Sequence, residues 1–261
     1  MPRRKKSTFA DLRERAEKLR LYGLLSDWAT LSSESWVAQL IELEEEERSR
    51  RSHEYRLRNA KIGAFKDRAE FDWKHAKAID RLQIDELFTL DFVEEGQNVV
   101  FLGPNGVGKT LFARNLAYAS VSRGWATRYV SASDMLTDLA SYNGSTLRNR
   151  LKRYVTPRLL VLDELGYLSY DNHHADLLYE VVSRRYEQEA SIVLTTNRPF
   201  AEWNQVFEGA ACLATLVDRL CHRVEIVQID GASYRQTEGI LRAKGKRESR
   251  KSKLEPKPKK S

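Results

Sequence analysis

An eight-residue run rich in glycine carries the residue types best suited to chemistry in this sequence. In order, it consists of Gly103, Pro104, Asn105, Gly106, Val107, Gly108, Lys109 and Thr110. The run fits the pattern G-x-x-x-x-G-K-[ST], in which glycines let backbone N–H groups approach phosphate groups closely. Lys109 is suited to reach β- and γ-phosphates, and the hydroxyl of Thr110 is suited to bind Mg²⁺. The run therefore predicts a nucleoside triphosphate site such as one for ATP, with an ordinary glycine-rich turn as the alternative.

Two carboxylates end the aliphatic run Leu159-Leu-Val-Leu-Asp-Glu164. Ligands of open α/β sheets bind at the carboxyl ends of the strands, so these carboxylates are expected beside the phosphate loop. Asp163 is suited to hold Mg²⁺ through water, and Glu164 is suited to deprotonate an attacking water molecule. The additional glutamate favours hydrolysis over transfer of the phosphoryl group to a second substrate.

A third polar group ends the run Ile192-Val-Leu-Thr-Thr-Asn197. Asn197, or failing it Thr196, is suited to hydrogen-bond the attacking water or the γ-phosphate. The alternative is that these residues only cap a turn before Pro199.

Five short runs rich in aliphatic and β-branched residues must position these groups. They are residues 98–102, 127–131, 159–163, 192–196 and 224–229. Helical stretches separate the runs, and this alternation predicts an α/β fold with a five-stranded parallel sheet covered by helices on both faces.

The chain divides into four parts by pattern. Residues 1–60 read as a small helical module for contact with a partner or for self-assembly, and residues 61–96 as an apolar connector packed on the next domain. Residues 97–241 form the predicted ATPase domain, and residues 242–261 are a basic tail with the composition of disorder. In the module, we expect the helix-surface ion pairs Glu44–Arg48, Glu46–Arg50 and Glu47–Arg51.

The net charge of +7 is unevenly distributed along the chain. The tail contributes +8 and residues 3–6 contribute +4, which leaves the central body at −5. Basic ends predict a polyanionic partner such as nucleic acid, although they could serve only to keep the protein dissolved. No apolar run is long enough for a membrane span, and no secretory leader is expected, so we predict a cytoplasmic protein without a membrane partner. Cys212 and Cys221 are then expected to be reduced thiols.

These residues together resemble an AAA+ ATPase, and four segments are more specifically similar to the IstB family. The segments are Asp163-Glu-Leu-Gly-Tyr-Leu, Ser183-Arg-Arg-Tyr186, Thr196-Asn-Arg-Pro-Phe-Ala-Glu-Trp203 and Asp218-Arg-Leu220. This family comprises bacterial ATP-binding helpers of insertion sequences, which are relatives of DnaC helicase loaders, and the resemblance covers residues 7–240. It implies a protein that forms a ring or helical filament on duplex DNA with ATP and assists its transposase.

The resemblance also assigns roles to single residues. Residues 103–110 match the Walker A loop, Asp163 and Glu164 the Walker B pair, and Asn197 the first sensor. Arg219 matches the arginine finger that acts on the neighbouring subunit, with an intramolecular salt bridge to Asp218 or another nearby acid as the alternative. Arg184 and Arg185 are further candidates for the subunit interface. Only 38 residues follow Arg223, so we expect no C-terminal lid domain and assign no second sensor.

DNA contacts are expected on residues 133–154, which occupy the place of the extra DNA-facing helices of helicase loaders. The basic cluster consists of Arg148, Arg150, Lys152 and Arg153. Such side chains would neutralise phosphates with little preference for sequence, whereas an ordinary solvated helix face is the alternative.

Two other functions remain open from the sequence. A DnaC-type helicase loader would have the same catalytic residues but would act on single-stranded DNA, and the preferred form of DNA discriminates the two. A nucleic-acid scaffold with a catalytically silent phosphate loop is less favoured, because Lys109, Thr110, Asp163 and Glu164 are all intact.

Overall fold

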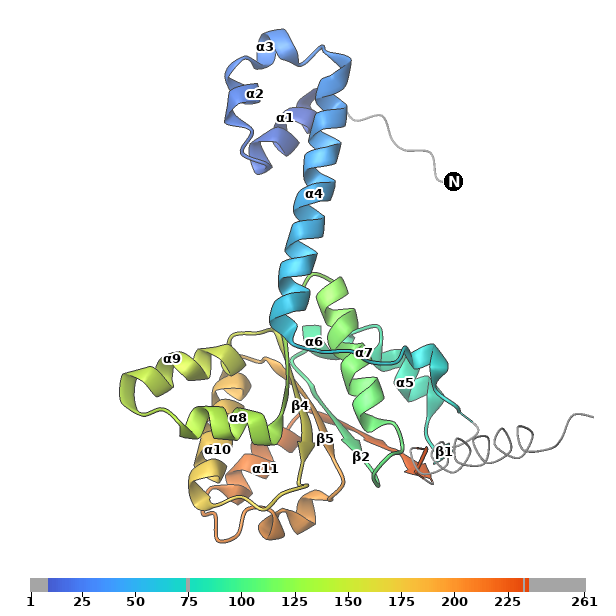
Figure 1. The fold of residues 1–261 in the computed structure, drawn as a ribbon, viewed down its shortest axis with the longest axis vertical. Coiled ribbons are helices and arrows are strands. Elements are labelled where there is room, and N and C mark those ends of the chain that lie inside the picture. The colour runs from blue at the N-terminus through green and yellow to red at the C-terminus, as the bar shows by residue number, and fades with distance from the viewer. Residues whose placement is uncertain (1–8, 74–75, 232, 235–261) are drawn as a thin grey trace, which may run out of the picture. The chain divides into compact units, whose positions relative to one another are not determined.

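The computed structural model of the chain describes residues 9–73, 76–231 and 233–234 (Figure 1). The chain forms two compact units, one up to Tyr55 and the other from Arg56 onward. The basic residues 3–6 and the predicted disordered tail lie outside the described residues, as does the region after Tyr234 on which the predicted absence of a lid depends.

Four helices build the first unit. They are α1 (Phe9–Lys18), α2 (Tyr22–Ser26), α3 (Trp28–Leu31) and the first part of α4 (Ser35–Ala60). Six buried side chains form its small core, namely those of Ala16, Leu19, Leu24, Trp28, Val37 and Ile41. Arg15 ties α1 to α4 through two hydrogen bonds to the Glu45 carboxylate, 2.7 and 2.9 Å long.

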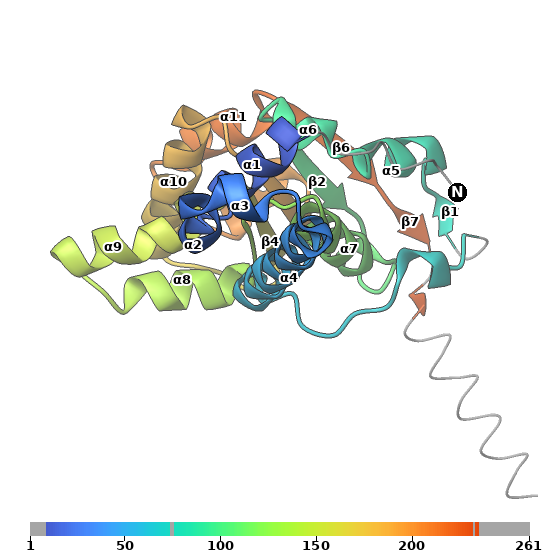
Figure 2. The same ribbon diagram turned by 90° about the horizontal axis from the view of Figure 1, so that it is seen from above.

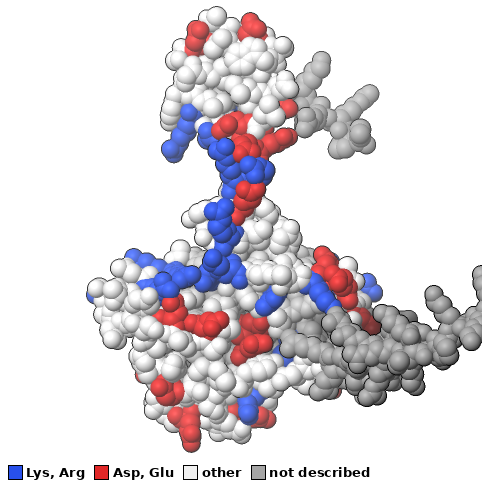
Figure 3. Space-filling view, in the orientation of Figure 1, with Lys and Arg blue, Asp and Glu red and all other residues white. Residues whose placement is uncertain are grey.

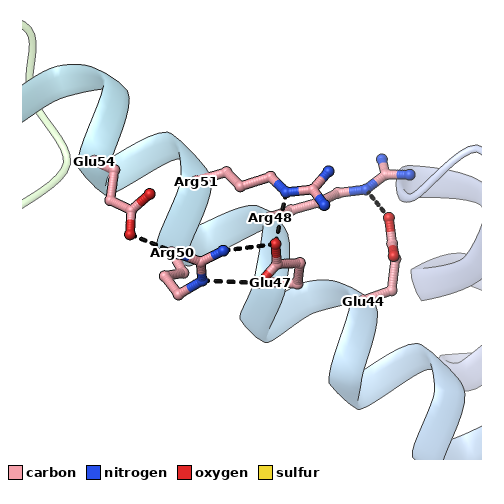
Figure 4. Close-up of polar contacts among 6 residues, drawn as sticks. All are labelled: Glu44, Glu47, Arg48, Arg50, Arg51 and Glu54. Carbon is pink, nitrogen blue, oxygen red and sulfur yellow. Dashed lines mark hydrogen bonds and ion pairs between the residues drawn. The ribbon is translucent and has the colours of Figure 1, made fainter.

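Ion pairs line the exposed side of α4 (Figure 4). The predicted pairs Glu44–Arg48 and Glu47–Arg51 form, each with a contact of 2.6 Å. The predicted pair Glu46–Arg50 is wrong, because Arg50 instead bonds Glu47 at 2.8 Å and Glu54 at 2.5 Å. An arginine on a helix reaches residues three and four positions away in both directions, and here it bridges two carboxylates that flank it.

A five-stranded parallel sheet forms the centre of the second unit. Its strands are β2 (Asn98–Leu102), β3 (Thr127–Ser131), β4 (Leu159–Leu165), β5 (Ser191–Thr196) and β6 (Val224–Gln228). Their order across the sheet is β3-β4-β5-β2-β6, and every neighbouring pair is parallel. The fold predicted from the alternating pattern is therefore confirmed.

Helices cover both faces of this sheet (Figures 1 and 2). On one face, α7 (Lys109–Ser122) packs on Val99, Phe101 and Val161. On the other face, Val100, Leu160 and Leu162 pack with buried side chains of four helices. Those helices are α8 (Ala132–Ala140), α9 (Gly144–Val155), α10 (Asn172–Glu187) and α11 (Leu213–Cys221). Successive residues of a strand point to opposite faces, which is why these runs are apolar throughout.

The segment before β2 packs on the α7 side of the sheet. It contains a short 3₁₀ helix η1 (Arg68–Glu70), β1 (Ala76–Ala78), α5 (Arg81–Leu87) and α6 (Asp91–Glu94). Ile84, Leu87 and Phe92 are buried in the same core as Phe112 of α7. The strand β1 pairs with β7 (Asp230–Gly231), and η2 (Phe200–Gln205) follows β5. Among the described helices, none combines the length and apolar character that a membrane crossing requires.

Candidate active site

The phosphate loop joins the end of β2 to the first residue of α7. Gly108 precedes the helix with φ of 110°, a left-handed conformation that favours glycine, and a Cβ atom there would lie 2.6 Å from the Phe71 ring. At Gly103, a Cβ atom would lie 1.9 Å from the carbonyl oxygen of Ile229. The loop thus packs against Phe71 on one side and Ile229 on the other. Its glycines lack the Cβ atoms that would clash with these two residues.

Lys109 is the first helical residue, and its side chain is only 4% exposed. Its ammonium group donates hydrogen bonds of 2.7 Å to the carbonyl oxygens of Gly103 and Pro104. The ring centroid of Tyr167 lies 6.0 Å from the same nitrogen. The charge is therefore held within the concave loop, where phosphate oxygens would compete with the loop carbonyls for it.

Asp163 lies at the end of β4, is 3% exposed and accepts hydrogen bonds from three hydroxyl groups. Its Oδ1 accepts from Thr110 at 3.0 Å and from Thr195 at 2.5 Å, and its Oδ2 accepts from Tyr129. Burial, together with the nearby Asp163, raises the pKa of the Tyr129 hydroxyl, which therefore remains a donor. Arg114 completes the network by donating from Nε to the Tyr129 oxygen at 2.9 Å.

The oxygen atoms of Thr110 and Asp163 also fit a magnesium ion. Mg²⁺ prefers hard oxygen ligands and retains several water molecules, so one hydroxyl and one carboxylate beside a phosphate site suffice. The hydrogen bond between the two side chains holds them within 3.0 Å of each other at the mouth of the loop.

Glu164 has an unusual backbone for a strand residue. Its φ of 63° is left-handed, and the pairing of β4 with β5 shifts register between Leu162 and Leu165. A β-bulge of this kind re-aims side chains that would otherwise alternate between the two faces. At this bulge Asp163 is buried, whereas the next residue, Glu164, is exposed.

Asn197 follows β5 next to the phosphate loop, since the N–H of Gly103 donates to the carbonyl of Thr196 at 3.3 Å. The Oδ1 atom of Asn197 is buried and has no hydrogen-bond partner among the residues that the structure describes. By contrast, the Thr196 hydroxyl is used in the turn, where it accepts from the N–H of Arg198 at 3.1 Å. Asn197 is therefore better suited than Thr196 to contact a water molecule or phosphate.

Arg219 lies near the amino ends of the strands, opposite to the end of the sheet that carries the phosphate loop. It is in the last turn of α11, whose Leu220 carbonyl accepts from the Asn98 side chain at the start of β2. Its guanidinium carbon is 5.1 Å from the ring centroid of Tyr179 and 5.7 Å from that of Tyr186. Within the described part of the chain it forms no ion pair, so the expected alternative of a salt bridge to Asp218 is not found. It borders a cavity of about 320 Å³.

Arg185 is not an interface residue, contrary to the sequence-based expectation. It is fully buried and donates to five backbone carbonyls, those of Tyr154, Val155, Pro157, Arg158 and Ser191. This burial lowers the pKa of Arg185 to about 9. Arg184, the neighbouring residue on α10, donates to the carboxylate of Glu180 on the same helix, and its place at a subunit interface stays a prediction.

The predicted basic cluster lies on α9, where Lys and Arg side chains gather on the face seen in Figure 3. Arg148, Lys152 and Arg153 are exposed. Arg150 points elsewhere, because its Nε donates to both carboxylate oxygens of Asp138 on α8, at 2.7 and 2.9 Å. Three of the four predicted DNA contacts are therefore exposed and available to an external anion.

Sequence reasoning missed Thr195 and Tyr129, which contact Asp163 from the two strands that flank β4. The signal available in the sequence was a polar residue inside a buried strand, as in the run Ile192-Val-Leu-Thr195. A buried hydroxyl needs a hydrogen-bond partner, and the nearest strand end offers a carboxylate.

A family model described as IstB-like ATP binding protein matches residues 10–241. The chain belongs to this family. It is 34% identical over 213 residues to the ATP-binding protein of insertion sequence IS5376 from Geobacillus stearothermophilus, which covers 81% of this chain and 84% of that protein. It is also 34% identical over 231 residues to the corresponding protein of IS232 from Bacillus thuringiensis subsp. berliner, with 87% and 91% covered.

Among solved structures, the fold is similar to that of the DnaC helicase loader. The TM-score is 0.50 at 21% identity, and the match covers 66% of this chain and 97% of that one. The comparisons confirm the predicted family resemblance and the AAA+ fold. Together with the Walker A loop and the paired carboxylates, they identify this IstB-like protein as a P-loop ATPase.

Proposed function

We propose that this ATPase is a transposition helper that assembles on duplex DNA, hydrolyses ATP and recruits or stimulates its transposase. The relatives encoded in insertion sequences IS5376 and IS232 support the transposition context. The position of Arg219 carries the proposal of assembly, and the exposed cations of α9 support contact with DNA.

Hydrolysis would divide among the residues around the phosphate loop. Lys109 binds the β- and γ-phosphates in place of its two loop carbonyls, and Asn197 orients the attacking water through its Oδ1 atom. Glu164 accepts the proton of that water. Mg²⁺, held by Thr110 directly and by Asp163 through water, would neutralise charge on the phosphate oxygens.

The site of one copy would be completed by a second copy. Arg219 lies near Asn98 at the start of β2, whereas the phosphate loop follows Leu102 at its end. The intervening strand is about 13 Å long at the usual rise per residue, so Arg219 does not serve its own phosphate loop. We infer a homo-oligomer, either a ring or a helical filament, in which Arg219 stabilises charge on the γ-phosphate of the next copy.

DNA would contact the exposed cations of α9. Arg148 and Lys152 are four residues apart and thus share a helix face, and Arg153 is adjacent to it. Point charges on a helix surface bind phosphates without reading base edges, so binding would be largely independent of sequence. Arg150 is not expected to contact DNA, because Asp138 holds its guanidinium.

A helicase loader that acts on single-stranded DNA is the alternative function. Its support is the likeness to the DnaC helicase loader, which at 21% identity concerns the fold only. Titration of fluorescent duplex and single strands of equal length discriminates the two functions by anisotropy. A higher affinity for duplex is expected, and a large preference for single strands would favour the loader.

The assembly itself is tested with the Lys109→Ala variant and duplex DNA. Electron microscopy with a non-hydrolysable ATP analogue is expected to show assemblies for the parent and few or none for the variant. Arg123→Ala, which removes an exposed arginine paired with Glu94 in the ATPase unit, is the control for loss of a cation and should assemble as the parent does. Equal assembly by Lys109→Ala and the parent would contradict a nucleotide-dependent switch.

A further inference from the structure

The bulge in β4 interrupts the regular ladder of backbone hydrogen bonds to β5. Leu162 pairs with Leu194 and Leu165 pairs with Thr196, so three steps along β4 face two steps along β5. The extra residue falls at the two carboxylates, and Glu164 takes the left-handed conformation. An additional residue in one strand disrupts the ladder of hydrogen bonds at that point.

The side chain of Thr195 on β5 takes the place of the missing ladder bond. Its Oγ1 accepts a hydrogen bond of 2.9 Å from the N–H of Glu164. The same oxygen donates a hydrogen bond of 2.5 Å to Oδ1 of Asp163. One hydroxyl group thus connects the backbone of Glu164 with the carboxylate of Asp163.

This connection is rigid for two reasons. Thr195 is 1% exposed, and a β-branched side chain in a strand has few rotamers. In addition, the hydroxyl forms two hydrogen bonds at once, since it donates its proton to Asp163 and accepts from the N–H of Glu164. Rotation of the side chain would break both. In the part of the chain that the structure describes, the other donors to Asp163, on Thr110 and Tyr129, form no hydrogen bond to the Glu164 backbone and so do not duplicate this link.

We propose that Thr195 is a positioning residue for hydrolysis, which fixes the backbone of Glu164 relative to Asp163. It keeps the Glu164 carboxylate aimed at the attacking water while Asp163 remains at the metal side of the site. The inference rests on the role proposed above for Glu164. Loss of the Thr195 hydroxyl is expected to affect turnover and to leave nucleotide binding nearly unchanged, because Thr110 and Tyr129 would still donate to the Asp163 carboxylate.

The test is the Thr195→Val variant, which keeps the shape of the side chain and removes the hydroxyl. A small misplacement of a catalytic group costs roughly 100-fold in rate, so we expect kcat to fall by about 10- to 100-fold. The KM for ATP and the Kd for a non-hydrolysable analogue should stay within about 3-fold of the parent if uniform binding is untouched. Thr195→Ser restores the hydroxyl and should recover most of kcat.

Thr127→Val is the matched control. Thr127 is a buried strand threonine whose hydroxyl bonds Ser120 at 2.8 Å, away from the carboxylates. Its substitution measures the general effect of losing a buried strand hydroxyl, and kcat should stay at the parent value. Thermal unfolding of each variant checks the fold, and Thr195→Ala, expected to show the same fall in kcat, replaces Thr195→Val if the valine variant does not fold.

Several results would overturn the inference. They are a parent-like kcat in Thr195→Val, a loss of nucleotide affinity that accounts for the lower rate, or no recovery in Thr195→Ser. Glu164→Gln, measured in parallel, separates the two proposals. Rapid turnover by Glu164→Gln would refute the role of Glu164 itself, whereas an inactive Glu164→Gln beside an active Thr195→Val would refute only the role of Thr195.

Discussion

The hydroxyl of Thr110 lies 3.0 Å from Oδ1 of Asp163, in a hydrogen bond between residues 53 positions apart. It joins the first turn of α7 to the end of β4. This hydrogen bond fixes the phosphate loop relative to the carboxylates without involving Lys109, Glu164 or Arg219. Each of these three residues can therefore be replaced separately, and the effects on nucleotide binding and on turnover can be compared.

Glu164→Gln is expected to bind ATP as the parent does and to hydrolyse it at least about 100-fold more slowly. The amide keeps the size of the side chain but cannot accept a proton at neutral pH. Single-turnover hydrolysis and a nucleotide-binding titration measure the two steps separately. Weakened binding in proportion to the loss of rate would instead indicate that Glu164 serves the fold of the loop.

Arg219→Ala should lose hydrolysis alone but regain part of it when mixed with Lys109→Ala. In mixed assemblies, an intact phosphate loop from one variant meets an intact Arg219 from the other, whereas neither variant has both. Phosphate release is measured across mixing ratios with DNA present. Arg123→Ala, which removes an exposed arginine paired with Glu94, is the control for loss of charge and should remain active alone.

Lys152→Ala should reduce the salt dependence of duplex binding. Each phosphate contact contributes about 0.9 to the slope of log K against log salt concentration, so the slope should decrease by about 1. Arg150→Ala removes the same charge from the same helix but should leave the slope unchanged, because Asp138 holds that side chain. Equal effects of the two substitutions would indicate general electrostatic attraction without a defined contact face.

Arg185→Met should destabilise the ATPase unit without a specific effect on subunit contacts. Five carbonyl oxygens would lose their buried donor, at a cost of about 3 kcal/mol or more. The midpoint of thermal unfolding should fall by roughly 6 to 12 °C for a unit of this size. Arg184→Met, which affects only the pair with Glu180, should change the midpoint little.

The pair of Asp138 and Arg150 should make stability depend on pH in the acid range. Burial raises the pKa of the Asp138 carboxyl, but hydrogen bonds from Arg150 and Tyr154 outweigh this effect, and the net pKa is lowered. A lowered carboxyl pKa stabilises the fold above the ordinary value of about 4, and this contribution is lost as the pH falls through the folded-state pKa. The difference in unfolding midpoint between the parent and Arg150→Ala should therefore be constant near neutral pH and shrink below about pH 4.

The parts of the molecule that depend on local pattern could be predicted, and those that depend on geometry between segments could not. The spacing of glycines, lysine and threonine in the phosphate loop, and the aliphatic run that ends in Asp163 and Glu164, are specific to nucleotide-binding α/β folds. The bulge at Glu164 and its partner Thr195 could not be foreseen, because a bulge arises from the register of two strands. The burial of Arg185 was missed for a similar reason, since the carbonyls that bind it come from chain segments around residues 154–158 and 191.

The location of Arg219 away from its own phosphate loop has a numerical consequence for the proposed assemblies. In an open filament, the nucleotide site of one terminal copy receives no Arg219 from a neighbour, so the filament has one active site fewer than it has copies. A closed ring loses none. Turnover per copy should then rise with the length of the filament towards a plateau, whereas every site of a closed ring would be active.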